Sequence, residues 1–346
     1  MDTKLFNYHL PEELIADRPL DRGESRMMVL DRKKKKITHS KFSELVKYID
    51  KFTTVVFNST KVIPARIFGK RATGGVIEFL ILKPSGFNIW QVMVKPAKRV
   101  IEGETVIFPN GLTALIVRKD EQFADVKFSL ADSYLLEYLD SYGDIPLPPY
   151  ILKRRNEKHS RPEDREKYQT VYAKVPGSVA APTAGLHFND AVMEQIKTIT
   201  KGHVENIVLD VGLGTFLPVK SEKIEKHVMH KEHFTISEET VQRLYTDKQS
   251  RRKILAVGTT TVRALESATD ENHIITACDT DTDIFIYPGY KFRFVDMMLT
   301  NFHLPQSTLL MMISAFADRD FILHAYEEAV KEQYRFYSYG DCMLII

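Results

Sequence analysis

The sequence has few cysteines and no long apolar run. Its two cysteines, Cys278 and Cys342, are too few for a disulfide scaffold, suit a reducing compartment and form no metal-ligand motif. A membrane-spanning helix needs an apolar run of about 18 residues, and the sequence contains none. The N-terminal stretch MDTKLFNYHLPEELI is broken by polar side chains and does not resemble a signal peptide. We therefore expect a cytoplasmic protein.

A strong excess of one charge is also missing. The formal net charge is +2, which neither requires nor excludes nucleic acid, so local basic clusters are more informative than the total. The hydrophobic content of 44% and the charged content of 27% are typical of globular proteins. With 346 residues, the chain is long enough for two domains.

The pattern of apolar residues predicts two kinds of architecture. Between 66 and 129, six short strands separated by turns indicate a small closed barrel, and a helix over 132–140 follows. From 168 onward, strands alternate with helices, which predicts a layered α/β domain. We predict a discontinuous α/β domain over 1–65 and 151–346, with an inserted six-stranded β-barrel domain over 66–150. In the α/β domain we expect strands at 27–31, 53–58, 203–211, 232–237, 253–258 and 283–287, and helices at 189–199, 238–250, 261–268, 308–317 and 320–333.

The loop VPGSVAAPTAGLHF, residues 175–188, combines proline, glycine and small side chains. Small residues let backbone N–H groups approach a ligand, and the following helix directs its N-terminal dipole towards the loop. Thr183 and Gly185 are candidate ligand contacts, and His187 is a candidate acid or base. Taken alone, the loop favours the alternative, a tight connection with His187 buried in the core.

Two further segments place polar residues after predicted strands. In LDVGLGTFLPV, Asp210 is suited to ribose hydroxyls. Gly212 and Gly214 resemble part of a dinucleotide-binding motif, although its third glycine and its helix are missing. In KILAVGTTTVRALES, Thr259 or Thr260 is expected to cap a helix whose N-terminus, with Arg263, would favour a carboxylate. Ordinary capping is the alternative, and it explains only one threonine.

Histidines recur in HVMHKEHF, where His227, His230 and His233 are spaced by three. We predict no metal, because H-E-x-x-H is absent and EHFTIS is typical of a strand. We take His230 and Glu232 instead as a hydrogen-bonded acid/base pair.

Further along, LTNFHLP places polar residues after a strand, so that Asn301 and His303 would lie at the same sheet edge. We expect the C-terminal aromatic residues mostly to pack in the core, with one or two free to stack on a base or contact a cation. They are Tyr334, Phe336, Tyr337 and Tyr339.

Basic residues gather in an N-terminal loop and in KRRNEKHSRPEDRE, residues 153–166. The simpler interpretation of each of these two segments is an exposed, solvated loop. Arginines can also hold phosphates, and the second segment is the strongest candidate for contact with nucleic acid. The candidate RNA contacts are Arg22, Arg26, Arg66, Arg154, Arg155 and Arg161.

Taken together, these stretches resemble one family, the S-adenosylmethionine:tRNA ribosyltransferase-isomerases of queuosine biosynthesis. The resemblance runs from near residue 5 to the C-terminus and rests most on TAGLHF and TNFHLP, in that order. FNSTKVIPARIFGKR, YGDIPLPPYI and AVGTTTVRALES also resemble it. The sequence departs from the expected pattern at Asp17 and at Ser59, where the family has glutamine and aspartate.

The resemblance implies an α/β fold with an inserted barrel and an unusual reaction. The ribosyl part of S-adenosylmethionine would join the aminomethyl group of a deazaguanine at the tRNA wobble position. It would rearrange to an epoxy-cyclopentane, giving epoxyqueuosine, while adenine and methionine leave. The substrates would be S-adenosylmethionine and tRNA, with no metal and no membrane, and we expect a monomer.

That chemistry requires a base beside the sulfonium and an acid at the departing adenine. Our candidates are His187, His230, Glu232 and His303, without a division of roles. Two alternatives stay open: an S-adenosylmethionine-dependent RNA methyltransferase and a non-catalytic RNA-binding protein. The first would normally have a glycine-rich loop after its first strand, and the second leaves the polar loops unexplained.

Overall fold

The structure is a computed structural model that describes residues 1–212, 219 and 221–346. The chain forms two compact units. The first comprises Met1–Thr60, Gln169–Val175 and Ala181–Ile346, and the second comprises Lys61–Tyr168 and Pro176–Ala180. The boundaries that the sequence predicts for the barrel domain, 66 and 150, lie inside the second unit. This unit is wider because it also contains α2 (Pro149–Arg155) and α3 (Asp164–Lys167). The charged segment 153–166 is therefore partly helical.

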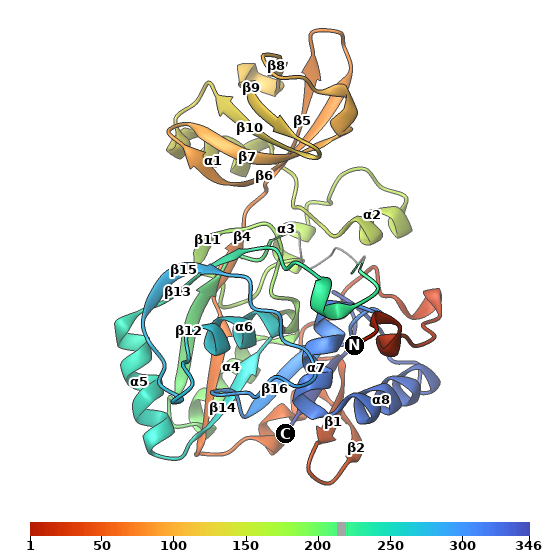
Figure 1. The fold of residues 1–346 in the computed structure, drawn as a ribbon, viewed down its shortest axis with the longest axis vertical. Helices are drawn as coiled ribbons and strands as arrows, with labels where there is room; N and C mark the ends of the chain where they lie inside the picture. The colour runs from red at the N-terminus through yellow and green to blue at the C-terminus, as the bar shows by residue number, and fades with distance from the viewer. Residues whose placement is uncertain (213–218, 220) are drawn as a thin grey trace. The chain divides into compact units, whose positions relative to one another are not determined.

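The second unit contains the predicted barrel (Figure 1). Its described residues close six strands in the order β10-β7-β6-β5-β8-β9. They are β5 (Arg66–Arg71), β6 (Val76–Gly86), β7 (Ile89–Lys95), β8 (Thr105–Ile107), β9 (Thr113–Asp120) and β10 (Phe123–Phe128). The predicted helix follows as α1 (Asp132–Tyr142), which ends two residues beyond the expected bound of 140 and has Gly143 as its C-cap. A Cβ atom on Gly143 would lie 1.9 Å from the carbonyl oxygen of Pro64, so the close backbone approach requires glycine.

The first unit contains a large mixed sheet. Within the described residues, nine strands follow the order β15-β13-β12-β3-β14-β16-β17-β1-β2. They are β1 (Arg26–Asp31), β2 (Lys36–Lys41), β3 (Thr53–Asn58), β12 (Val204–Leu209), β13 (Glu232–Ile236), β14 (Lys253–Val257), β15 (Cys278–Thr282), β16 (Met297–Asn301) and β17 (Cys342–Ile345). The central strands β12, β3, β14 and β16 run parallel, which confirms the α/β class.

The five predicted helices of this unit form within about two residues of their expected bounds. They are α4 (Asp190–Ile199), α5 (Glu238–Gln249), α6 (Thr259–Ser267), α7 (Thr308–Ala317) and α8 (Arg319–Lys331). The strand expected at 283–287 is wrong: the edge strand is β15, immediately before it, whose polar sequence CDTDT has no apolar alternation to reveal it. Short 3-10 helices also form at Glu12–Leu14, Phe42–Tyr48 and Thr183–His187. The short strands β4 (Thr60–Val62) and β11 (Val175–Ser178) pair with each other.

Period-2 alternation gives the sheet two buried faces. Val55 and Phe57 of β3 belong to the same buried core as Leu255 and Val257 of β14, and α4 contributes to this core. The register pairs Asn206 with Phe57 and Val257 with Leu299, so the central strands end close together. Polar residues that follow these strands therefore meet at one edge. None of the described helices combines the length and apolar character that a membrane span requires.

Candidate active site

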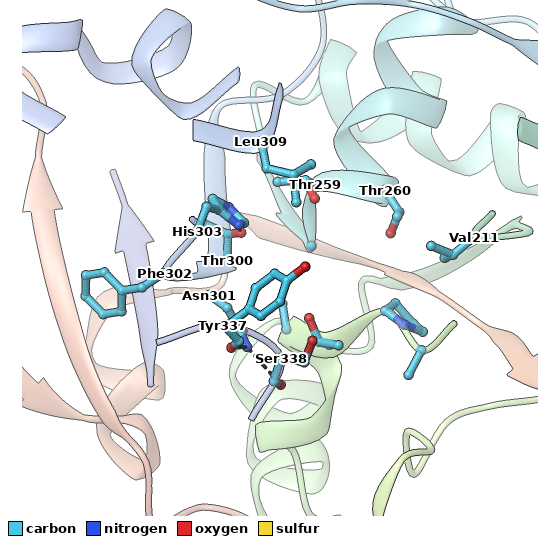
Figure 2. Close-up of a pocket in the computed structure, with 15 residues that line it drawn as sticks. Val211, Thr259, Thr260, Thr300, Asn301, Phe302, His303, Leu309, Tyr337 and Ser338 are labelled. Carbon is cyan, nitrogen blue, oxygen red and sulfur yellow. Dashed lines mark hydrogen bonds between the residues drawn. The ribbon is translucent and has the colours of Figure 1, made fainter. Parts of the chain in front are cut away.

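A pocket lies at the carboxyl ends of the central strands (Figure 2). It is a partly open pocket with a cavity volume of about 40 Å³, and the space between its walls, open solvent included, is about 510 Å³. Its walls come from the 181–184 segment, the second residue after β12, the start of α6, the end of β16 and two loops. The lining residues are Ala181, Pro182, Thr183, Ala184, Val211, Gly258, Thr259, Thr260, Thr300, Asn301, Phe302, His303, Leu309, Tyr337 and Ser338. The site thus occupies the sheet edge at which ligands of parallel α/β sheets usually bind.

The N-terminus of α6 forms one wall. Gly258 is its N-cap, with φ of +89°, and no side chain caps the helix. The expectation that Thr259 or Thr260 caps α6 is therefore wrong: they are the first two residues of the helix, and both line the pocket. The positive φ favours glycine at this turn. Backbone N–H groups of the first turn and the helix dipole make this wall suitable for an anion.

Asn58 ties three elements together beneath this wall. Its amide donates to the carbonyl of Leu209 at 2.8 Å and to Thr260 Oγ1 at 3.4 Å, and its Oδ1 accepts from the Leu209 N–H at 3.0 Å. Asn58 is fully buried, so these bonds fix the end of β12 relative to α6. Sequence analysis did not select Asn58, although its position at the end of a buried strand was a usable signal.

His303 lines the pocket and is almost fully buried, with 5% of its surface exposed. Its Nε2 lies 2.9 Å from Thr300 Oγ1, and its backbone N–H donates to the Tyr326 hydroxyl at 2.8 Å. Burial lowers the pKa of His303 to about 3, so its imidazole is neutral near pH 7. Of the lining residues that the structure describes, His303 and Tyr337 have titratable side chains.

His187 lies one hydrogen bond behind the pocket. Asn301 Nδ2 donates to the carbonyls of Tyr337 and Ser338 at 3.0 and 3.2 Å, which leaves Asn301 Oδ1 as an acceptor. His187 Nε2, 3.0 Å away, must therefore carry a proton and donate it to this oxygen. His187 Nδ1 then accepts from Ser25 Oγ at 2.8 Å. Burial lowers the pKa of His187 to about 4, which keeps the ring neutral. These contacts suit a residue that positions Asn301 and does not meet the ligand itself.

Asp210 directly follows β12 and precedes the pocket residue Val211, but it does not itself line the pocket. Its Oδ1 accepts from Thr60 Oγ1 at 2.9 Å, and burial raises the pKa of its carboxyl group. Thr260 and His303, which line the pocket, lie at the same sheet edge, and His187 is joined to that edge through Asn301. His187, Asp210, Thr260 and His303 thus lie at one edge of the sheet, and two of them, Thr260 and His303, line the pocket.

Glu232 forms a buried ion pair with Arg263, and its Oε1 accepts from the Gly212 N–H at 3.0 Å. His230 is exposed, which does not favour the acid/base pair that the sequence suggested for it and Glu232. Neither Glu232 nor Arg263 lines the pocket. The pair anchors β13 to α6 and reaches the backbone of Gly212.

The small residues of the 175–188 loop divide into two roles. Thr183 lines the pocket. Gly185 does not, and a Cβ atom there would lie 1.9 Å from the Tyr172 hydroxyl oxygen, so packing against Tyr172 explains this glycine. Gly214 lies outside the described residues.

Most of the candidate RNA-binding arginines are engaged within their own unit. Arg22 donates to the Gln169 carbonyl at 2.6 Å, and Arg26 lies over the Tyr334 ring at 3.8 Å. Carboxylates hold the others: two hydrogen bonds of 2.7 and 3.0 Å join Arg66 to Glu78, and bonds of 3.0 and 2.9 Å join Arg155 to Asp164. The Arg161–Glu157 pair lies at 2.6 Å. The sixth arginine, Arg154, is exposed.

Comparison with known proteins agrees with this arrangement. The family model described as "Queuosine biosynthesis protein" matches residues 3–345. Among solved structures, the chain is similar to an S-adenosylmethionine tRNA ribosyltransferase from Thermotoga maritima. The two are 33% identical, the alignment covers 99% of this chain and 100% of the other, and the TM-score is 0.53. The similarity therefore extends over both units.

Proposed function

Because the chain belongs to the queuosine biosynthesis protein family, we propose that its pocket is where the ribosyl part of S-adenosylmethionine is transferred to tRNA. The protein is a tRNA-modifying ribosyltransferase-isomerase. It joins the ribosyl carbons to the aminomethyl group of a deazaguanine at the wobble position and isomerises them to the epoxy-cyclopentane of epoxyqueuosine. Adenine and methionine are the leaving products.

The observation that supports this site is its position. The pocket combines the uncapped N-terminus of α6 with neutral polar side chains at the carboxyl edge of a parallel sheet. The α6 N-terminus suits the carboxylate of the methionine part. Asp210, directly after β12, suits the ribose hydroxyls. Arg263 is paired with Glu232 and supports this wall from behind rather than meeting the carboxylate itself.

Proton transfer at this site is assigned to His303. The sulfonium acidifies the adjacent ribose methylene, and a base must remove a proton there while the departing adenine gains one. His303 lines the pocket and is neutral at pH 7, so it can accept a proton. The proton that it accepts from the methylene is then available for the departing adenine. His187 holds Asn301 and so positions the wall formed by Tyr337 and Ser338.

On the RNA side, we propose that exposed Arg154 contributes a phosphate contact. Arg155, its neighbour, is buried against Asp164 and supports the fold instead. Arg154→Glu should weaken tRNA binding. It should also reduce the slope of log Kd against log salt by about 1, which is the contribution of one phosphate contact. Arg155→Glu is the contrasting variant, because its main effect should be a loss of stability. An unchanged slope in Arg154→Glu would remove the segment from the interface.

The reaction itself is tested by its products. The protein is incubated with S-adenosylmethionine and a tRNA that carries the aminomethyl-deazaguanine, and the small molecules are analysed by mass spectrometry. Equal amounts of adenine and methionine indicate ribosyl transfer. S-adenosylhomocysteine would indicate a methyltransferase, and the absence of turnover a binding protein.

Two general properties belong to the same proposal. We propose a cytoplasmic location, which a free tRNA substrate supports, and a monomer, which is supported by a pocket whose described lining comes from one chain. Light scattering coupled to size-exclusion chromatography measures the oligomeric state. A monomer has a mass near 39.8 kDa, and a mass of twice that value would contradict the proposal.

A further inference from the structure

Tyr337 occupies an unusual backbone position at the pocket. Its φ is +76°, a conformation that L-residues rarely adopt, so the surrounding structure must hold it. Asn301 Nδ2 donates to its carbonyl at 3.0 Å, and its own N–H donates to the Phe302 carbonyl at 3.0 Å. Both contacts come from the end of β16 and the residue that follows it. A strained backbone held at a cavity is typical of a functional position.

The strained backbone directs one aromatic ring away from the core. Tyr334 and Phe336 are fully buried, and Tyr339 is 3% exposed, as core packing requires. Tyr337 alone among these four aromatic residues lines the pocket and is partly exposed. Figure 2 shows its ring reaching into the middle of the lining residues, with the hydroxyl directed towards Thr259 and Thr260. The ring therefore forms a surface that a ligand in the pocket would meet.

The pocket offers a cation little else. Among the described residues, those that line the pocket include no aspartate or glutamate, and His303 is neutral; the carboxylate of Asp210, beside the pocket residue Val211, is the one proposed for the ribose hydroxyls. S-adenosylmethionine carries a permanent positive charge on sulfur, which must be accommodated close to the reacting ribose. The face of an aromatic ring attracts a cation through its quadrupole. Burial raises the pKa of Tyr337 above its ordinary value, so the phenol stays protonated and the attraction must come from the ring face.

We propose that Tyr337 holds the sulfonium of S-adenosylmethionine against its ring and makes the pocket select this cation over a neutral thioether. The inference rests on the proposed function, since it places that substrate in this pocket. It assigns the two charged ends of the methionine part to opposite walls. The carboxylate meets the N-terminus of α6, and the sulfonium meets Tyr337.

The test compares the binding of S-adenosylmethionine with that of S-adenosylhomocysteine, which has the same shape without the methyl group and the charge. Isothermal titration calorimetry measures both affinities for wild type, Tyr337→Phe and Tyr337→Leu. A ring contact to a cation corresponds to a roughly 3- to 30-fold preference. We expect Tyr337→Leu to lose this preference and Tyr337→Phe to keep it. Leu309→Ala, in the same pocket, is the matched control and should weaken both ligands equally.

A second measurement separates charge from packing. Phenylalanine analogues with increasing fluorination, incorporated at position 337, keep the shape of the ring and weaken its attraction for cations. The affinity for S-adenosylmethionine should fall with each added fluorine, while that for S-adenosylhomocysteine should not. Equal losses for both ligands, or no trend with fluorination, would overturn the proposal. A wild-type protein that shows the preference but releases no adenine and methionine would contradict the proposed function and leave this inference standing.

Discussion

The two edges of the parallel sheet in the first unit use polar residues in different ways. At the carboxyl edge, the pocket is lined by neutral groups: threonines, Asn301, Tyr337 and a neutral His303. At the opposite edge, where β3, β12 and β14 begin, the polar groups are charged and paired. Asp247 accepts from Thr54 Oγ1 at 2.7 Å and lies 2.7 Å from His203 Nδ1 and 3.7 Å from Arg252 Nε.

This difference separates binding from stability. A buried charge must be paired, and pairing consumes the hydrogen-bonding capacity that a ligand would need. Asp247 therefore links α5 to β3, and these contacts take up most of its hydrogen-bonding capacity. The pocket at the carboxyl edge keeps an uncapped helix and neutral lining side chains, which can meet the charges that a substrate brings, and the charged Glu232–Arg263 pair stands behind it. Substitutions at the carboxyl edge should accordingly affect turnover, and substitutions at the opposite edge should affect the free energy of unfolding.

The largest effect should come from His303 at the carboxyl edge. His303→Gln removes the proposed proton carrier, and such losses lower turnover by about 10²- to 10⁴-fold. The affinity for S-adenosylmethionine should change little. Release of adenine and methionine under single-turnover conditions measures the rate. His203→Gln, at the opposite edge, is the control and should turn over like wild type; equal rates for both variants would break the comparison.

At the opposite edge, the main effect should be on folding. Asp247→Ala leaves Arg252 and Thr54 without their buried partner, and this should lower the free energy of unfolding by about 3 kcal/mol. Urea denaturation measures it. Gln242→Ala, exposed on the same helix, should leave stability unchanged. If Asp247→Ala instead lost catalysis at full stability, the two edges would not be divided as described.

Acid should destabilise the protein through the histidines of the carboxyl edge. The pKa of His187 falls from 6.5 to about 4 and that of His303 to about 3, so between these values and 6.5 the unfolded chain binds more protons. Stability is complete above pH 6.5 and falls as the pH drops, by about 1.4 kcal/mol per pH unit for each histidine. His187→Gln should reduce this slope, measured by urea denaturation between pH 4.5 and 7. An unaltered slope would mean that His187 is not held neutral.

The smallest effect is expected behind the pocket. Ser25→Ala removes the hydrogen bond to His187 Nδ1, which should cost about 1 kcal/mol of stability and only slightly slow turnover. The proton of His187 should stay on Nε2, because Asn301 still accepts it. Nitrogen-15 NMR reports this tautomer directly. A proton found on Nδ1 would show that Ser25, rather than Asn301, sets the orientation of the ring.

Local pattern was sufficient for much of this protein. Alternation and turn residues predicted the six barrel strands, and 3.6-residue periodicity predicted α4 to α8, because both depend on residues that are near in sequence. The motifs around Thr260 and His303 likewise identified the sheet edge that carries the pocket. The segment 283–287 was misread, because an apolar run can pack without pairing into a sheet.

Only the tertiary structure decided which partner each polar residue contacts. His187 and Asn301 are 114 residues apart in the chain, and only their hydrogen bond shows that His187 stands behind the pocket. In the same way, Arg155 is occupied by Asp164, and Tyr337 leaves the aromatic core through a backbone conformation that its residue type does not reveal. Sequence fixes which chemical groups are present and how they recur locally. The partner and orientation of each group depend on contacts between segments distant in the chain, and these exist only once the sheet has formed.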